Sequence, residues 1–174
     1  NKGKNKFKFE NSGIMKDNKI YTIKTTPLKT PITPLREKLD KNKVPEEFYI
    51  SEKDIPKWEY LKNAKKEERV TSSGFKFTFS EGAVQFPDPL NKPSRTIITT
   101  EGGNAPSRFK HVVKINGKNR RLTPTELERL NGFPTNHTKL KGVTDSKRAF
   151  FMGNALVVGI VRRLGKSIHQ FHYE

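Results

Sequence analysis

The residues best suited to contact another molecule are concentrated between Arg95 and Arg108, in the segment RTIITTEGGNAPSR. Arginine pairs bidentately with guanine, and Ser, Thr and Asn side chains reach base edges or phosphates. Two adjacent glycines, Gly102 and Gly103, allow backbone to pass where a Cβ atom would clash, as a loop that enters a groove requires. By its chemistry alone, the segment is either an ordinary polar turn or a loop that contacts nucleic-acid bases.

The charge of the chain narrows the class of partner. Its 174 residues include 35 Lys and Arg against 18 Asp and Glu, a formal net charge of +17. Such an excess indicates a polyanionic partner, most simply nucleic acid. RNA binding and an anionic membrane surface are the alternatives, and the lack of a long apolar run or signal-like N-terminus disfavours the membrane. Only 32% of residues are hydrophobic, which predicts long surface loops or a face that packs on something outside this chain.

The chain contains no cysteine, which excludes disulfides and thiolate metal sites. It therefore lacks the side chain best suited to act as a thiolate nucleophile. Its four histidines form no convincing ligand set, so we expect no metal site.

The element expected to hold the polar segment is a short helix within RLTPTELERLNGFP, residues 121–134. Thr123 is a good N-cap, and Glu126 stands three residues later, as a capping box requires. Leu122 and Leu127 occupy the two hydrophobic-staple positions around that cap. Before the helix, Asn116-Gly117 predicts a type I′ turn between two strands. The hairpin leads directly into the helix, and Arg121 at the junction is expected to tie loops to it.

Two segments upstream have two interpretations each. A helix is expected from Pro56 to about Arg69, and its outward lysines are either a solvated face or phosphate contacts. In Gly74–Phe79 every second residue is phenylalanine, which predicts a strand with one aromatic face. Core packing is the favoured role of these rings, and a stacking platform for single-stranded nucleic acid is the alternative.

The C-terminal segment predicts an amphipathic helix. Residues 145–152 are expected to form one or two helical turns that Gly153 interrupts, and Asn154 is expected to cap a last helix through about His169. Apolar residues recur along that helix at three- and four-residue steps, from Leu156 to Ile168. This stripe is too wide for a small basic chain to cover alone, although a plain packing helix remains an alternative.

Two of these segments resemble conserved motifs of bacterial DNA cytosine-5 methyltransferases. RLTPTELERLNGFP is similar to the ninth motif of that family, and FFMGNALVVGIVRRLG (residues 150–165) is similar to the tenth. Thr96-Ile97 resembles the Thr-Leu or Thr-Ile pair that precedes a glycine-containing loop in the family's target recognition region. The resemblance implies DNA contact by Arg95, Thr96, Ile97, Thr99, Thr100, Gly102, Gly103, Asn104, Ser107 and Arg108.

The same resemblance implies S-adenosylmethionine as the cofactor, bound mostly by another part of the enzyme. Asn154, Ala155 and Leu156 match positions that line one edge of that pocket, although Ala155 stands where the family often has serine. The implied partners are double-stranded DNA and a catalytic half or subunit that supplies the cysteine. Because the family's Pro-Cys and Glu-Asn-Val motifs are absent, we expect a C-terminal piece or one part of a split, cytoplasmic restriction-modification enzyme, inactive by itself.

The expected fold is α+β. A small, irregular, strand-rich DNA-recognition domain is followed by a C-terminal helix that packs on a Rossmann-like domain absent from this chain. The expected division is a basic lead-in at 1–45, a recognition domain at 46–145 and the tenth motif with its helix at 146–174. Within the lead-in, Phe7–Phe9 and Ile20–Ile23 are candidate strands. A stand-alone DNA-binding module and, less favoured, a basic RNA-binding domain are the alternatives.

Overall fold

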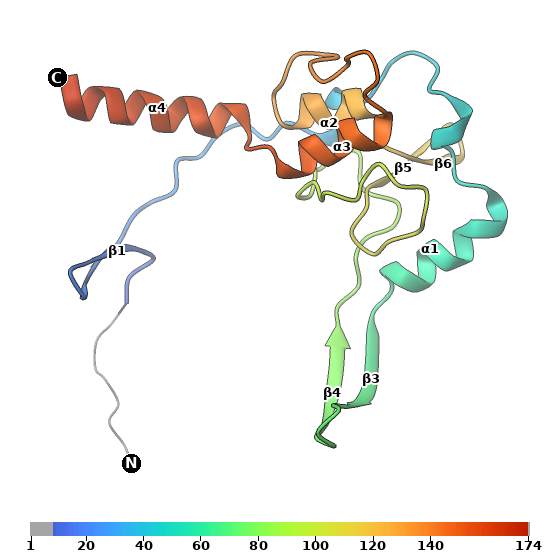
Figure 1. Ribbon diagram of the computed structural model, residues 1–174, viewed down its shortest axis with the longest axis horizontal. Helices are drawn as coiled ribbons and strands as arrows, with labels where there is room; N and C mark the ends of the chain where they lie inside the picture. The colour runs from blue at the N-terminus through green and yellow to red at the C-terminus, as the bar shows by residue number, and fades with distance from the viewer. Residues whose placement is uncertain (1–8, 174) are drawn as a thin grey trace. The chain divides into compact units, whose positions relative to one another are not determined.

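A computed structural model describes residues 9–173 (Figure 1). The chain forms two compact units, residues 1–31 and 32–174. Residues 32–45, expected in the basic lead-in, belong to the second unit because Leu35 and Leu39 are part of its core.

The first unit contains an antiparallel hairpin of β1 (Ser12–Lys16) and β2 (Lys19–Ile23). Asp17 and Asn18 form its turn with positive φ angles of 49° and 58°, a conformation that Asp and Asn tolerate better than most residues. The predicted strand at Ile20–Ile23 is therefore confirmed, whereas most of Phe7–Phe9 lies outside the described residues.

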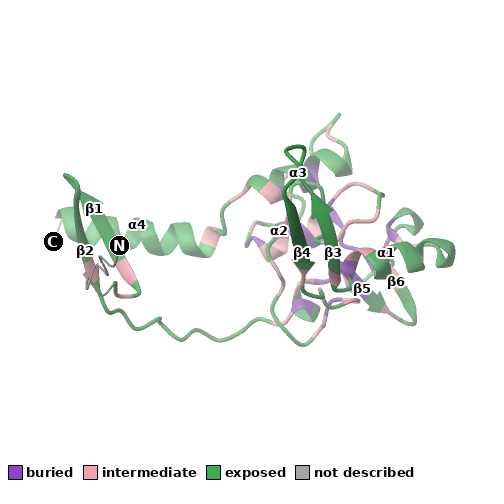
Figure 2. Ribbon diagram, turned by 90° about the horizontal axis from the view of Figure 1, so that it is seen from below, coloured by how far each residue is buried: buried purple, intermediate pink, exposed green. Residues whose placement is uncertain are grey.

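The core of the second unit lies between α2 (Pro124–Leu130), α3 (Asp145–Asn154) and the 3-10 helix η1 (Leu35–Lys38). Figure 2 shows buried residues in α2 and α3 and also near α1 and β5. The buried apolar cluster consists of Leu35, Leu39, Val113, Leu122, Leu127, Ala149 and Met152.

The short helix α2 has the predicted capping box. Thr123 Oγ1 accepts a bond of 3.2 Å from the Glu126 amide, and the Thr123 amide donates to Glu126 Oε2 at 2.8 Å. Arg120 also donates to both oxygens of Glu126, at 2.8 and 2.7 Å. Both side chains are buried, so this bidentate pair fixes the helix start to the preceding strand.

That strand belongs to the predicted hairpin, formed by β5 (Val112–Ile115) and β6 (Lys118–Arg121). Asn116 and Gly117 have φ angles of 48° and 81°, as a type I′ turn requires. Two further 3-10 helices, η2 (Glu46–Phe48) and η3 (Glu52–Asp54), lie in the segment before α1.

The helix expected to reach Arg69 is wrong beyond residue 62. Helix α1 spans Ile55–Lys62, and β3 (Lys65–Val70) then pairs antiparallel with β4 (Lys76–Glu81). Pairing with β4 overrides the helical pattern of residues 65–70. One of the cross-strand contacts is that of the Arg69 guanidinium, which lies 3.5 Å from the centroid of the Phe79 ring.

The expected core packing of the phenylalanine strand is also wrong for two of its three rings. Phe75 is 66% exposed and Phe77 is 39% exposed. Figure 1 shows the β3–β4 hairpin extending away from α2 and α3, so it has no second layer against which these rings pack.

The predicted helix break at Gly153 is wrong as well. Helix α3 continues through Gly153 to Asn154, and α4 (Val158–Tyr173) begins after a short connection. Asn154 does not cap α4, because its Nδ2 donates to the carbonyl of Phe150 one turn back. No helix in the described part of the chain has both the length and the apolar character of a membrane span.

Candidate nucleic-acid interface

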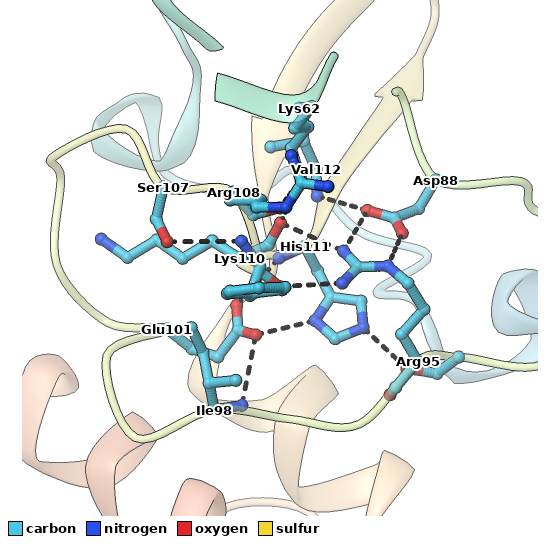
Figure 3. Close-up of polar contacts among 12 residues, drawn as sticks. Lys62, Asp88, Arg95, Ile98, Glu101, Ser107, Arg108, Lys110, His111 and Val112 are labelled. Carbon is cyan, nitrogen blue, oxygen red and sulfur yellow. Dashed lines mark hydrogen bonds and ion pairs between the residues drawn. The ribbon is translucent and has the colours of Figure 1, made fainter. Parts of the chain in front are cut away.

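The loop 95–107 is fastened at its start by Arg95. Its guanidinium bonds both oxygens of Asp88, at 2.7 and 3.2 Å, and donates to the carbonyls of Phe109 and Lys110 (Figure 3). Asp88 also accepts from the Val112 amide at 2.8 Å. Arg95 therefore joins the beginning of the loop to the beginning of β5.

A buried polar chain crosses beneath the loop. Glu101 accepts from the backbone amide of His111 at 3.0 Å, and its other oxygen lies 2.8 Å from His111 Nδ1. His111 Nε2 lies 3.0 Å from the hydroxyl of Ser94. The side chains of Glu101 and His111 are almost completely buried, so the middle of the loop is held from inside by charge-assisted bonds.

The glycines of the loop and of α3 permit close backbone packing. A Cβ atom on Gly102 would lie 2.7 Å from the Cα of Ser146, and one on Gly153 would lie 2.4 Å from the Cα of Thr99. Ser146 also donates to the Gly102 carbonyl at 3.1 Å. Gly102 thus lets the loop lie directly on α3, a packing role that the expected groove entry did not anticipate.

Arg121 and Lys110 complete the support of the loop. Arg121 donates to the carbonyls of Gly102, Gly103 and Glu47, which confirms its predicted role of tying loops to the helix. Lys110 Nζ donates to the carbonyls of Gly103 and Ala105, each at 2.7 Å. Burial lowers the pKa of both cations.

Apart from Ala105, the exposed side chains of this loop are hydroxyls and an amide. Thr96, Thr99, Thr100 and Asn104 are exposed, and Ser107 is half-buried. Ile97 differs, because it packs against the apolar core. The structure therefore brings the expected residues together on a supported loop, with polar groups on its outside.

Arg108 occupies a position that its sequence context did not predict. Its Nη1 donates to the carbonyls of Leu61 and Asn63, each at 3.1 Å, and its Nη2 donates to the carbonyl of Gly82. Its side chain is 12% exposed and also pairs with Glu81 at 3.4 Å. These contacts direct the guanidinium to the neck of the β3–β4 hairpin and away from an outside ligand.

The hairpin itself presents charge and aromatic rings to solvent. Cross-strand partners share a face, so Arg69, opposite Phe77, lies on the aromatic face, and Lys66, Lys76 and Thr78 lie on the other. At the tip, the Thr71 hydroxyl accepts from the Phe75 amide at 3.1 Å. Sequence periodicity missed β3. A signal for it was the short separation in sequence between residues 65–70 and the phenylalanine strand that follows, which is typical of a hairpin.

The C-terminal end of the second unit carries a different surface. Asn154 and Leu156 are exposed and Ala155 is half-buried, at the connection from α3 to α4. The apolar stripe of α4 is also exposed, with Leu164 at 58% and Ile168 at 59%. Among the described residues, no group of His, Asp or Glu side chains is arranged to hold a metal ion.

Comparisons with known proteins identify the family. The chain matches the family model of the C-5 cytosine-specific DNA methylase over residues 3–170. The chain belongs to this family. It is 42% identical over 164 residues to the type II methyltransferase M.Sau3AI of Staphylococcus aureus, which covers 94% of this chain and 39% of that relative. The chain therefore spans well under half of the length of the relative that it matches.

Solved structures of methyltransferases share the fold. The Entamoeba histolytica methyltransferase EhMeth gives a TM-score of 0.53 at 16% identity, over 86% of this chain and 46% of that one. The S. pombe Dnmt2 methyltransferase gives 0.57 at 14% identity, over 82% and 42%. The mixed helices and small sheets described above agree with the α+β class expected from the sequence.

Proposed function

We propose that this chain is the DNA-recognition and C-terminal part of a DNA cytosine-5 methyltransferase of restriction-modification type. The whole enzyme transfers a methyl group from S-adenosylmethionine to C5 of a cytosine that is flipped out of a specific duplex site. The observation that carries the proposal is the 95–107 loop, which is fixed from beneath by Arg95, Glu101, Lys110 and Arg121 and presents hydroxyl and amide groups outward.

The direct contacts that we assign to this loop come from Thr96, Thr99, Thr100, Asn104 and Ser107. Hydroxyl and amide side chains bond base edges and phosphates, and a pre-formed loop loses little conformational entropy on binding. Arg95, Ile97, Gly102, Gly103 and Arg108 are assigned to this site as residues that shape it, because their contacts are with the protein.

The β3–β4 hairpin supplies a second DNA-contacting surface under this proposal. A two-stranded β-ribbon fits the major groove of B-form DNA, and Lys66 and Lys76 are exposed on one face of the ribbon. Lys is depleted in protein–protein interfaces, and the cations of these strands are Lys65, Lys66, Arg69 and Lys76, which outnumber the carboxylates Glu67, Glu68 and Glu81. A hydrated, charged partner such as DNA suits this surface better than an apolar protein face.

The exposed stripe of α4 docks on the catalytic part of the enzyme, which also supplies the cysteine nucleophile. Contiguous exposed apolar surface of this kind marks an interaction site, and 61% of the M.Sau3AI chain lies outside the matched region, since 39% is covered. Asn154, Ala155 and Leu156 offer an amide and apolar groups that suit one edge of a nucleoside pocket. S-adenosylmethionine supplies the methyl group when bound there.

Binding measurements on two variants test the proposal. Asn104→Ala removes an outward loop amide and is expected to weaken binding to the specific duplex by about 1–3 kcal/mol with little change on other duplexes. Lys66→Ala is expected to weaken binding to all duplexes alike and to reduce the salt dependence. Identical behaviour of both variants across a panel of duplexes would remove the loop from the recognition surface. Tighter binding to RNA at matched salt would contradict DNA recognition.

A further inference from the structure

Two cations cross between the neck of the β3–β4 hairpin and the end of the 95–107 loop. The Arg108 guanidinium donates to carbonyls on both sides of the hairpin, at Leu61 and Asn63 before β3 and at Gly82 after β4. One side chain from the loop end therefore holds both strands of the hairpin where they leave the body of the unit.

The second cation makes the same connection in the opposite direction. Lys62, at the end of α1, directs its Nζ to the carbonyls of Arg108 and Lys110, at 3.2 and 2.6 Å (Figure 3). The lysine is 1% exposed, and burial lowers its pKa to about 8. Even as a neutral amine it retains two N–H donors, enough for both carbonyls.

This reciprocal clamp, Arg108 with Lys62, opposes independent movement of the two segments. Swinging the hairpin would separate the Arg108 guanidinium from the carbonyls of Asn63 and Gly82. Lys62, the last residue of α1, holds the base of the hairpin to the same loop end, because its two bonds reach the carbonyls of Arg108 and Lys110. Such charge-assisted hydrogen bonds are stronger than those between neutral groups. A buried charge that is left without its partners is strongly destabilising. The hairpin and the loop therefore hold one relative orientation.

We propose that Arg108 and Lys62 are positioning residues that hold the β3–β4 hairpin and the 95–107 loop as one rigid DNA-contacting surface. The inference rests on the proposed function, since it assumes that both segments contact DNA. Two separately mobile elements would each lose conformational freedom on binding, whereas a pre-organised pair does not. Sequence discrimination then depends on two residues that do not themselves touch a base.

Distance measurements between spin labels test the clamp without DNA. The chain has no cysteine of its own, so labels attach selectively at Ser72→Cys on the hairpin tip and Asn104→Cys on the loop, both exposed positions. We expect one narrow distance distribution, which Arg108→Ala broadens and Arg108→Lys partly restores. Lys62→Met should broaden it as well.

Arg129→Ala is the matched control for general loss of stability. Arg129 also donates to a carboxylate and a carbonyl, those of Asp40 at 2.7 Å and Lys38 at 3.3 Å, but it joins η1 to α2. This variant should lower thermal stability without changing the label distribution. Broadening by Arg129→Ala equal to that by Arg108→Ala would overturn the inference, because the effect would then be generic.

Binding to duplex DNA gives the second readout. After selection of the preferred site from random duplexes, Arg108→Ala is expected to reduce the ratio of specific to non-specific affinity by about tenfold, and Arg129→Ala is expected to leave the ratio unchanged. If wild-type protein discriminates between duplexes and Arg108→Ala discriminates equally well, this inference fails while the proposed function stands. If wild-type protein binds no duplex, the proposed function fails, and the inference fails with it.

Discussion

The region around α2 and the β3–β4 hairpin place similar residue types in opposite environments. At α2, the Arg120–Glu126 pair and Leu127 are buried, and their partners lie within the chain. In the hairpin, an arginine and phenylalanines also lie together, yet Phe75 and Phe77 remain exposed. The first region completes its structure internally, whereas the second leaves its side chains exposed to solvent.

Helix α4 extends the comparison to apolar surfaces. Leu127 on α2 is 0% exposed, while Leu164 on α4 is 58% exposed. Both helices have an apolar side, but that of α2 is covered by the chain and that of α4 is exposed. Buried contacts thus separate the parts of the chain that stabilise its own fold from those left exposed, and four experiments test this separation.

The largest effect is expected from Glu126→Ala. The substitution leaves the buried Arg120 guanidinium without its carboxylate and also removes acceptors for the amides of Thr123 and Asp40. Removing one partner of a buried ion pair destabilises by about 3–5 kcal/mol. Urea unfolding followed by circular dichroism measures the change.

The double variant Arg120→Met/Glu126→Leu is the control for this pair. Replacing both charges with apolar side chains should be less destabilising than removing one, because no uncompensated charge remains. Unchanged stability of Glu126→Ala would show that α2 does not hold the second unit together.

Gly153→Ala is expected to have the next largest effect. Its methyl group would lie 2.4 to 2.6 Å from backbone atoms of Ile98 and Thr99, so the loop must move away from α3. Overpacking of this kind costs typically about 1–3 kcal/mol, and amide hydrogen exchange in the loop should accelerate. Gly165→Ala is the matched control, since nothing lies within 4 Å of the added atom. Slow exchange retained in Gly153→Ala would contradict close packing of the loop on α3.

A smaller, pH-dependent effect is expected at Glu128. Burial raises its pKa, but hydrogen bonds from Thr138 and Arg148 outweigh burial and lower the pKa below the ordinary 4.5. A lowered acid pKa stabilises the folded state above pH 4.5, and that contribution is lost as the pH falls through the folded-state pKa. The difference in unfolding free energy between wild-type protein and Glu128→Gln should therefore shrink below pH 4.5. A constant difference across that range would mean that the charge of Glu128 is not involved.

The smallest change in stability is expected for Leu164→Glu and Ile168→Glu on α4. Exposed positions tolerate substitution within about 0.5 kcal/mol, yet both variants should bind less of a dye specific for apolar surface. The same chemical change at the buried position, Leu127→Glu, should instead destabilise the second unit markedly. Strong destabilisation by Leu164→Glu would show that this side of α4 is already covered within the chain.

The sequence predicted the elements whose signals are local. The capping box at Thr123 and Glu126 and the Asn116-Gly117 turn are each specified within a few residues, and the structure confirms both. The helix expected through Arg69 was wrong because pairing with β4, a contact between separate segments, decided that region. The helix break expected at Gly153 was wrong because the glycine serves a close contact with Thr99, a residue far away in the sequence.

The candidate site shows the same division. The polar residues of the 95–107 loop were identified from their chemistry, and the structure places them together on one loop. The position of Arg108 was not predictable, because its carbonyl partners at Leu61, Asn63 and Gly82 carry no side-chain signal. Backbone acceptors of a side chain can be identified only from the folded structure, because every residue carries a carbonyl.

The most direct test of DNA recognition is selection from random duplex DNA by the purified chain at two salt concentrations. We expect one short sequence to be enriched at both, with weaker retention at the higher salt because phosphate contacts release counterions. Salt-sensitive retention without enrichment would restrict this chain to phosphate contacts. The absence of duplex retention at either salt would contradict the account.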